Sequence, residues 1–250
     1  MKLSNHKSFN KEYSKLYDTF YKSKNYSKEV TLIKDLIKKK NLLILELGCG
    51  TGSYTKKLEP QSKKIVAVDK SKYMIDIAKK KNLKKTLFLT SDIKSLKFNN
   101  KFDVIVSLFH ILSYQKNEVE VKKFFELAKY LKKGGFFIFD FWYAEGVNYL
   151  KPKKTTLIIK KKNQVIKRMS SPKWNMKKKL VSVKYKINIQ YPKKKTKNIY
   201  EEHLMKYFSL KEVQKLLTKN NLKLIKNLGQ DFISTPSKND WSVISISQKN

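Results

Sequence analysis

The sequence predicts an α/β fold with a mostly parallel, seven-stranded sheet and an antiparallel β insertion. Between residues 42 and 141, β-branched and aromatic runs alternate with amphipathic stretches, which is typical of successive strand–helix–strand units. From 155 to 207 the pattern changes to alternating polar and apolar residues, which is typical of antiparallel strands. A glycine-rich segment follows the first apolar run, where such sheets bind ligands.

The elements of the first half are predicted from their hydrophobic spacing. Residues 12–39 carry apolar positions at helical intervals, so a helical segment is expected before the first strand. Gly134 and Gly135 are expected to form the C-terminal cap of the helix that begins near 117. The parallel strands are predicted at 42–46, 64–69, 86–89, 102–107 and 135–141.

The second half combines the insertion with the end of the core. Ser209 and Glu212 have the spacing of a capping box, which predicts a helix to about Asn220. The last two strands are expected at 222–228 and 241–247. The insertion is expected to contain strands at 155–160, 164–169, 180–190 and 199–207, with turns at Lys162-Asn163, Ser171-Pro172 and Pro192.

A chain of 250 residues can bury one large core, so a single domain over 1–250 is expected. We divide it into an N-terminal helical cap (1–40), a cofactor-binding core (41–145), an antiparallel β lid (146–207) and a final helix with two strands (208–250). One cysteine excludes an internal disulfide, and no apolar stretch has the length of a signal peptide or a membrane span. A soluble, cytoplasmic protein without a membrane partner is expected.

The net charge of +37 has two interpretations. A basic surface favours nucleic acids, but Arg168 is the only arginine among 57 lysines and arginines, and arginine is preferred for phosphate and base contacts. Lysines are spread along the whole chain with abundant Asn and Ile, which is typical of A/T-rich coding. A solvated basic surface is therefore favoured over a nucleic-acid interface, and it can still attract an anionic small substrate.

The segment Glu46-Leu47-Gly48-Cys49-Gly50-Thr51-Gly52 contains three of the seven glycines of the chain. Glycine costs backbone entropy on folding, so three together indicate a turn that needs positive φ or close approach of a ligand. Cys49 is expected to be a small packed residue and not a nucleophile. The segment predicts a binding loop at the end of the first strand.

Carboxylates follow three successive predicted strands. Glu46 disfavours a pyrophosphate and suits the ammonium and sulfonium of S-adenosylmethionine. Asp69 ends the second strand, where a carboxylate can accept both ribose hydroxyls. Asp92 follows the third strand and offers an acceptor for an adenine amino group. Together they predict S-adenosylmethionine as the cofactor.

At these positions the chain resembles the class I S-adenosylmethionine-dependent methyltransferases. The resemblance is carried by residues 46–52, by Val68 to Met74 and by Ser91-Asp92-Ile93. It implies a Rossmann-like fold in which Gly48 and Gly50 pass the methionine part of the cofactor. It also implies that Asp69 holds the ribose, that Met74 lies against the adenine, and that Asp92 and Ile93 border the base.

Residues for the acceptor are expected after strands four and five, because methyl transfer needs an aligned nucleophile and, where it starts protonated, a base. His110 is the best general-base candidate, and a structural imidazole is an equal alternative. Tyr114 is an alternative hydrogen-bonding partner for the acceptor. Trp142 and Tyr143 fit an apolar wall for a sugar ring or packing under the lid. We expect the cluster Glu201-Glu202-His203 to be a solvated strand face.

A narrower resemblance is to the sugar N,N-dimethyltransferases of nucleotide-linked amino sugars. It rests on Tyr17-Asp18-x-x-Tyr21, Lys24-Asn25-Tyr26, Phe109-x-x-x-x-Tyr114 and the lysine-rich insertion, and it departs at His110. It implies that Tyr17 and Tyr26 close over the methionine end, with Tyr17 near the transferred methyl group. The expected catalytic residues are His110, Tyr17 and Tyr114. The expected cofactor-binding residues are Tyr17, Tyr26, Glu46, Gly48, Gly50, Asp69, Lys70, Met74, Asp92, Ile93 and Leu108, and no metal site is predicted.

The sequence therefore predicts a methyltransferase for an amine or hydroxyl of a small acceptor, with an anionic nucleotide-linked sugar as the leading class. An RNA- or protein-directed methyltransferase and a non-catalytic cofactor-binding regulator remain the alternatives. A homodimer is compatible with the sequence.

Overall fold

The computed structural model describes residues 8–192 and 195–250 and confirms the α/β class. Its central sheet carries the parallel strands β3 (Thr86–Thr90), β2 (Ser62–Asp69), β1 (Leu42–Leu47), β4 (Phe102–Ser107) and β5 (Leu131–Tyr143), in this order. β11 (Ser242–Lys249) pairs antiparallel with β5, and β10 (Leu222–Leu228) pairs antiparallel with β11. These seven strands are those that the sequence predicts.

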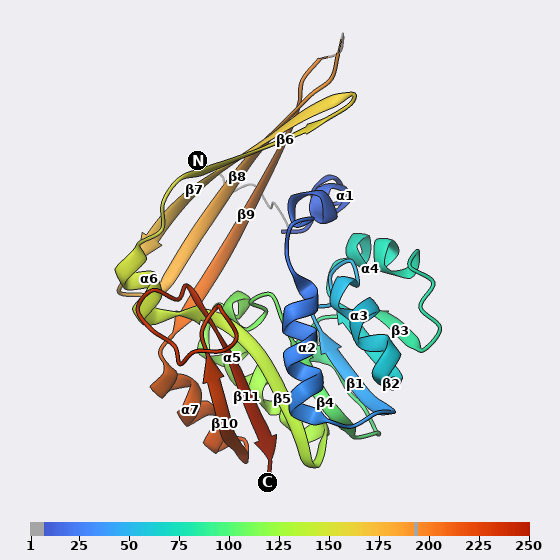
Figure 1. Ribbon diagram of the computed structural model, residues 1–250. Helices are drawn as coiled ribbons and strands as arrows, with labels where there is room; N and C mark the ends of the chain where they lie inside the picture. The colour runs from blue at the N-terminus through green and yellow to red at the C-terminus, as the bar shows by residue number, and fades with distance from the viewer. Residues whose placement is uncertain (1–7, 193–194) are drawn as a thin grey trace.

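Helices cover both faces of this sheet, as Figure 1 shows. α2 (Tyr26–Ile37), α3 (Ser53–Leu58) and α4 (Lys72–Lys79) pack on one face, and α5 (Glu118–Glu126) and α7 (Leu210–Lys219) on the other. Successive side chains of a strand point to opposite faces. Ile44 therefore joins the cluster under α2 to α4, whereas Leu45 joins the cluster under α5 and α7.

The insertion forms an antiparallel sheet, which we call the lid. It consists of β6 (Thr155–Lys161), β7 (Gln164–Asn175), β8 (Leu180–Gln190) and β9 (Lys197–Phe208), and it follows α6 (Ala144–Leu150). β9 also pairs parallel with the end of β5, with Trp142 opposite Tyr207 and Tyr143 opposite Phe208. The lid is thus a continuation of the central sheet, and it rises from one side of the core (Figure 1).

α1 (Lys11–Phe20) lies against the inner face of the lid. Tyr13 and Phe20 pack against Ile166, Ile187 and other aliphatic residues of β7 to β9. The side chain of Asn10 accepts hydrogen bonds from the backbone of Glu12 and Tyr13, which caps the helix N-terminus. The predicted helical segment is therefore two helices, one on the lid and one on the core.

The prediction for Gly134 and Gly135 is wrong. The helix ends in a 3₁₀ turn, η4 (Leu127–Tyr130), and β5 has begun by Leu131. Both glycines lie inside β5, where the pairing with β4 shifts register between Phe102 and Val104. Gly134 has φ of 73°, and a Cβ on Gly135 would lie 2.9 Å from the backbone oxygen of Lys132. The glycines serve a bulge in the strand and not a helix cap.

The predicted turn at Ser171-Pro172 is also wrong, because β7 continues to Asn175. Pairing of β7 with β6 stops at Ser170, so Pro172 lies on a free edge of β7. Proline has no backbone N–H, and on this free edge no neighbouring strand needs one for a ladder hydrogen bond. The capping box at Ser209 and Glu212 is confirmed. Three further 3₁₀ turns are η1 (Glu59–Gln61), η2 (Ile93–Ser95) and η3 (Leu112–Tyr114).

No helix within 8–192 and 195–250 has both the length and the apolar character needed to cross a membrane.

Candidate active site

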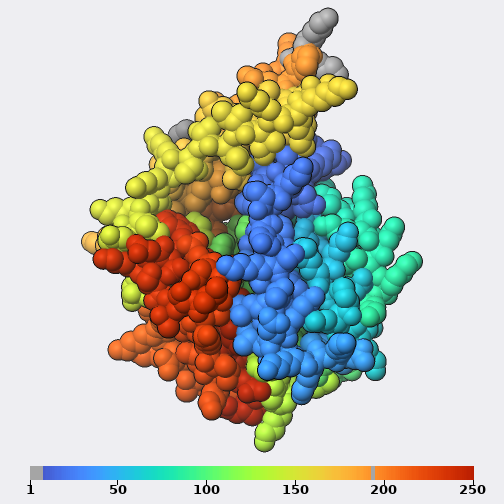
Figure 2. All heavy atoms as spheres, in the orientation of Figure 1, coloured from blue at the N-terminus to red at the C-terminus, as the bar shows by residue number. Residues whose placement is uncertain are grey.

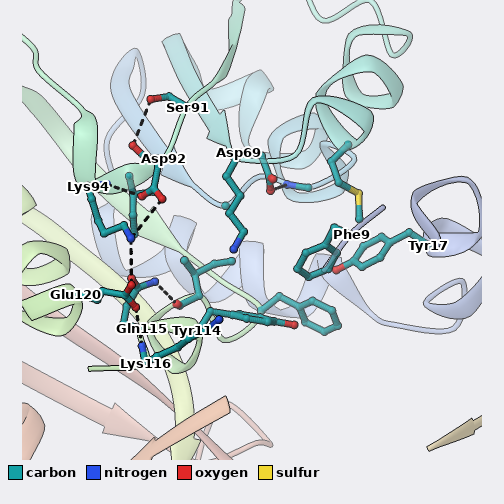
Figure 3. Close-up of a pocket in the computed structure, with 17 residues that line it drawn as sticks. Phe9, Tyr17, Asp69, Ser91, Asp92, Lys94, Tyr114, Gln115, Lys116 and Glu120 are labelled. Carbon is teal, nitrogen blue, oxygen red and sulfur yellow. Dashed lines mark hydrogen bonds and ion pairs between the residues drawn. The ribbon is translucent and has the colours of Figure 1, made fainter. Parts of the chain in front are cut away.

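A cavity of about 240 Å³ lies at the carboxyl ends of the parallel strands β1 to β4 (Figure 3). This is the edge of the sheet at which α/β folds bind ligands. Most of the predicted cofactor-binding residues line it. They are Tyr17, Gly48, Gly50, Asp69, Lys70, Met74, Asp92 and Ile93, together with the predicted acceptor-side residue Tyr114.

The loop after β1 reaches the cavity because its glycines take conformations that other residues avoid. Gly48, Gly50 and Gly52 have φ of 69°, 55° and 79°. A Cβ on Gly48 would lie 2.2 Å from Cδ1 of Ile111, so a larger residue would displace that side chain. The backbone N–H groups of Gly48 and Cys49 donate to the carbonyl of Val68, which ties the loop to β2. The loop is therefore held open beside Asp69.

Asp69 is fixed by the backbone on both of its oxygens. Oδ2 accepts from the N–H of Gly50 at 2.9 Å, and Oδ1 accepts from the N–H of Ser71 at 2.8 Å. Burial raises the pKa of Asp69, and these two hydrogen bonds act in the opposite direction. Each carboxylate oxygen can accept a second hydrogen bond. The geometry suits a ligand with two neighbouring hydroxyl groups.

A charged network closes the opposite end of the cavity (Figure 3). Nζ of Lys94 lies 3.1 Å from Oε1 of Glu120 and 3.6 Å from Oδ2 of Asp92. The other oxygen of Asp92 accepts from the backbone N–H of Lys94 at 2.9 Å. Asp92 is thus held beside Ile93 with its carboxylate at the cavity wall.

Three predicted cofactor-binding residues lie outside this cavity lining. Glu46 is buried, accepts a hydrogen bond from Oγ1 of Thr55 at 2.6 Å, and has its pKa raised to about 8 by burial. Leu108 is part of the core under α2 to α4. Tyr26 packs edge-on against Tyr54, with ring centroids 4.8 Å apart. In this structure the side chain of Glu46 therefore bonds to Thr55 in the protein interior and does not line the cavity.

Cys49 packs in the same core cluster as Leu108, as expected. Burial raises the pKa of its thiol well above the usual range, so it is no nucleophile at neutral pH.

His110 lies beside the cavity and faces a second pocket between α2, β5 and the segment after β10. Phe109 and His110 both have φ of 69°, which is unusual for residues with a side chain. Asp140 on β5 stabilises this turn, because its carboxylate accepts from the N–H of Phe109 at 3.1 Å and of His110 at 2.6 Å. Nδ1 of His110 is 3.1 Å from Oδ2 of Asp140.

Asp140 and His110 thus form a dyad. Burial by itself would raise the pKa of Asp140, but the imidazole, the backbone N–H of His110 and the charge of Lys24 outweigh it and lower the pKa. A carboxylate next to Nδ1 favours the tautomer with the proton on Nδ1. Nε2 then carries the lone pair that a general base needs.

Phe109 separates the cofactor-side cavity from the pocket that holds His110. Its ring lines the cavity, and Nζ of Lys24 lies 4.9 Å from the ring centroid. Lys24 is in turn paired with Glu29 at 2.6 Å, and Lys24 and Glu29 both line the second pocket. One aromatic side chain therefore divides the two spaces.

The prediction that residues 201–203 form a solvated face is wrong for Glu201 and His203, which are each 3% exposed. They lie on the inner face of β9, in alternation with Glu202, and α1 covers them. The carboxylate of Glu201 accepts from the backbone N–H groups of Phe9 and Asn10, each at 3.0 Å. Burial raises the pKa of Glu201 and these hydrogen bonds counteract it.

His203 links the lid to the cavity. Its Nδ1 lies 2.9 Å from the hydroxyl oxygen of Tyr114. The ring of Phe9, which lines the cavity, packs against both, with centroids 5.0 Å from His203 and 5.6 Å from Tyr114. Oγ of Ser71, on the loop after β2, donates to the carbonyl of Phe9 at 2.9 Å. Phe9 therefore joins the lid, the cavity and the Asp69 loop.

A third pocket lies between the inner face of the lid and the end of the core sheet. Trp142 and Trp241 form one wall, with ring centroids 5.1 Å apart, and Tyr185 lies on the lid side. Tyr143 alternates to the other side of β5 and is buried in the core. Of the two aromatic residues predicted as an acceptor wall, Trp142 alone lines this pocket.

Sequence reasoning assigned no site role to further residues of the cavity. Phe109 and Ile111 belong to the segment after β4 that already carried His110 and Tyr114, so position alone could have indicated them. Lys94 and Glu120 come from separate elements and have no local signal. The same holds for Phe9, whose place depends on Glu201, 192 residues away.

The cavity, its glycine loop and Asp69 lie in a segment that matches a known family model. The model describes a methyltransferase domain and matches residues 44–135. Residues 44–135 are therefore similar to a methyltransferase domain. An uncharacterized methyltransferase of Bacillus mycoides is 32% identical to the chain over 136 residues, which are 51% of the chain and 63% of the relative. The chain thus spans just under two thirds of the length of the curated relatives that it matches.

Solved structures resemble nearly the whole chain, core and lid together. A S-adenosylmethionine-dependent methyltransferase of Clostridium acetobutylicum superposes with a TM-score of 0.82, at 22% identity, over 96% of this chain and 98% of its own. An S-adenosylmethionine-bound amino pentose methyltransferase of Micromonospora echinaspora gives a TM-score of 0.77 at 12% identity, over 98% of this chain and 100% of its own. The chain has the fold of S-adenosylmethionine-dependent methyltransferases.

Proposed function

We propose that this chain is a S-adenosylmethionine-dependent methyltransferase that acts on an amine or hydroxyl of a small acceptor, with a nucleotide-linked sugar as the leading class. The observation that carries the proposal is the position of Asp69. Its two backbone-fixed oxygens lie beside the glycine loop and Met74 in one cavity, which suits the ribose of an adenosyl group. The predicted roles of Gly48, Gly50, Asp92 and Ile93 agree with this arrangement.

The chemistry of the acceptor is assigned to His110 with Asp140. When bound, S-adenosylmethionine supplies an electrophilic methyl group on a sulfonium. His110 would accept a proton from the acceptor amine or hydroxyl on Nε2, while the Asp140 carboxylate, 3.1 Å from Nδ1, stabilises the resulting imidazolium. Asp140 also fixes the backbone on which the imidazole is carried. Tyr17, on the side of Gly50, remains the residue proposed to lie near the transferred methyl group.

The acceptor is proposed to bind between the lid and the core. Figure 2 shows a recess where the lid, α1 and the C-terminal segment meet. Trp142, which lines the pocket between the lid and the core sheet, is 6.4 Å from His110 between ring centroids. Aromatic faces pack well against the apolar face of a sugar ring. The amino pentose methyltransferase shares the fold over 98% of this chain. No specific contact favours an RNA or protein acceptor over a small one.

The test begins with calorimetric titration of the protein with S-adenosylmethionine. Release of S-adenosylhomocysteine is then measured against amino and hydroxyl nucleotide sugars, RNA and a protein extract. Saturable cofactor binding with sugar-dependent release would support the proposal. RNA-dependent release would replace the acceptor class, and absence of cofactor binding would overturn the assignment itself. A tight cofactor complex without any turnover would instead favour a regulator.

A further inference from the structure

Arg168 stands out because it is the one arginine of the chain, and all the other 56 of its 57 basic Lys and Arg residues are lysines. It lies on β7, on the inner face of the lid. Its guanidinium carbon is 4.8 Å from the ring centroid of Phe20, 5.5 Å from that of Tyr21 and 5.0 Å from that of Tyr185. A planar guanidinium stacks on aromatic rings in a way that an ammonium on a flexible stem does not.

This half-buried cation has no carboxylate within 4.0 Å among residues 8–192 and 195–250. Nη1 donates one long hydrogen bond, of 3.4 Å, to the hydroxyl of Tyr21. The buried carboxylate on the same face of the lid, Glu201, is engaged by the backbone of Phe9 and Asn10. Sequestered charges in proteins are normally paired, and a guanidinium has five donors. Arg168 therefore has unused capacity for an anion.

Arg168 lines neither the proposed acceptor pocket nor the cofactor cavity, but it contacts aromatic residues at or next to the lining of each. Tyr185, which it stacks on, lines the pocket that holds Trp142 and Trp241. Tyr21, which it also contacts, packs against Phe109 with centroids 4.8 Å apart, and Phe109 lines the cofactor cavity. A ligand group bound to Arg168 would thus be separated from the acceptor pocket by Tyr185. It would be separated from the cofactor cavity by Tyr21 and Phe109.

We propose that Arg168 binds a phosphoryl group of the acceptor and so restricts the enzyme to phosphorylated or nucleotide-linked substrates. The inference rests on the proposed function and adds its specificity-determining residue. A phosphate matches the bidentate fork of a guanidinium, whereas the many surface lysines act as point charges. A bound phosphoryl group would supply the negative charge that no described residue places next to Arg168.

The experiment uses inorganic pyrophosphate as the probe and the full chain saturated with S-adenosylhomocysteine. Calorimetry measures pyrophosphate binding by the wild type, Arg168→Gln and Lys167→Gln. Lys167 is the adjacent residue on the exposed face of β7, so both variants lose one positive charge. We expect one pyrophosphate per chain, at least tenfold weaker binding in Arg168→Gln, and less than twofold change in Lys167→Gln. Arg168→Lys, which keeps the charge over the rings, should recover only part of the affinity.

Several results would overturn the proposal. Equal weakening of pyrophosphate binding in both glutamine variants would assign binding to overall charge. Wild-type affinity in Arg168→Gln, together with a lowered melting temperature, would make Arg168 a structural contact of α1. Malonate that binds as tightly as pyrophosphate would also refute phosphate selectivity. Affinity for S-adenosylhomocysteine is measured first in every variant, so failure of the cofactor assignment is distinguished from failure of the anion site.

Discussion

Nδ1 of His203 lies 2.9 Å from the hydroxyl oxygen of Tyr114, although 89 residues separate them in sequence. His203 belongs to the lid and Tyr114 to the wall of the cofactor cavity. Burial lowers the pKa of His203 to about 4, with the charges of Arg168 and Lys70 acting in the same direction. The imidazole is therefore neutral at pH 7 where it meets Tyr114.

The His203 contact predicts an acid-sensitive fold. Its folded pKa of about 4 lies below the ordinary value of 6.5, so the unfolded chain binds the proton first as pH falls through 6.5, and stability declines until the folded state also protonates near pH 4. This residue alone should lower the free energy of unfolding by about 2 kcal/mol between pH 7 and pH 5. Urea unfolding at both pH values, in wild type and His203→Gln, measures the difference. The same pH effect in both proteins would contradict the assignment.

Glu201→Gln should loosen the N-terminal helix. The substitution places an amide N–H₂ where one of two backbone N–H groups now donates, so Phe9 or Asn10 loses its acceptor in a buried place. We expect a loss of about 2 kcal/mol in stability and faster hydrogen exchange in residues 9–20. Glu202→Gln, on the adjacent position of the same strand, is the control and should leave the exchange of α1 unchanged. Identical exchange in the two variants would argue against anchoring by Glu201.

Asp69→Ala should weaken the binding of S-adenosylmethionine. Loss of two hydrogen bonds to a charged acceptor is expected to cost about 3 kcal/mol, which is roughly a hundredfold in Kd. Calorimetry compares it with Asp76→Ala, because Asp76 is an exposed carboxylate on α4. An unchanged Kd in Asp69→Ala would remove the ribose role from this residue.

His110→Ala should reduce kcat by about a hundredfold, as expected for loss of a general base, with less than a threefold change in the Kd of S-adenosylmethionine. Asp140→Asn should reduce kcat as well, since the amide no longer stabilises an imidazolium and the strained turn at Phe109 loses one acceptor. Steady-state rates with an acceptor identified by the S-adenosylhomocysteine-release assay provide the measurement. Full activity in His110→Ala would show that His110 is not the general base. The proton of the acceptor would then have to be taken by Tyr17, Tyr114 or solvent.

The sequence allowed the core to be predicted because its signals are local. Apolar runs marked every strand of the sheet, and the glycine loop with Asp69 and Asp92 marked the strand ends that meet at one edge. A parallel sheet converts such local signals into a site without further information. The capping box at Ser209 was predictable for the same reason, since its partners lie three residues apart.

Long-range contacts explain what could not be predicted. Alternation on β9 indicated that Glu201 and His203 share a face, but not that α1 would bury it. Glu46 occupies the expected strand end, yet its direction is set by Thr55 on α3. The register shift that places Gly134 inside β5 depends on its pairing with β4. In each case the deciding partner belongs to another element.

The main-chain pairing between β5 and β9 has a consequence for how ligands enter. Trp142 and Tyr143 join the lid to the central sheet by backbone pairing with Tyr207 and Phe208, and this continuous sheet resists hinge motion. α1 is held over the cavity by side chains, among them Glu201 and the contact of Asp18 with Thr51 at 2.5 Å. We therefore expect α1 to move when ligands enter or leave the cavity, while the lid keeps its position. Release of cofactor should then increase amide exchange in α1 while β9 stays protected.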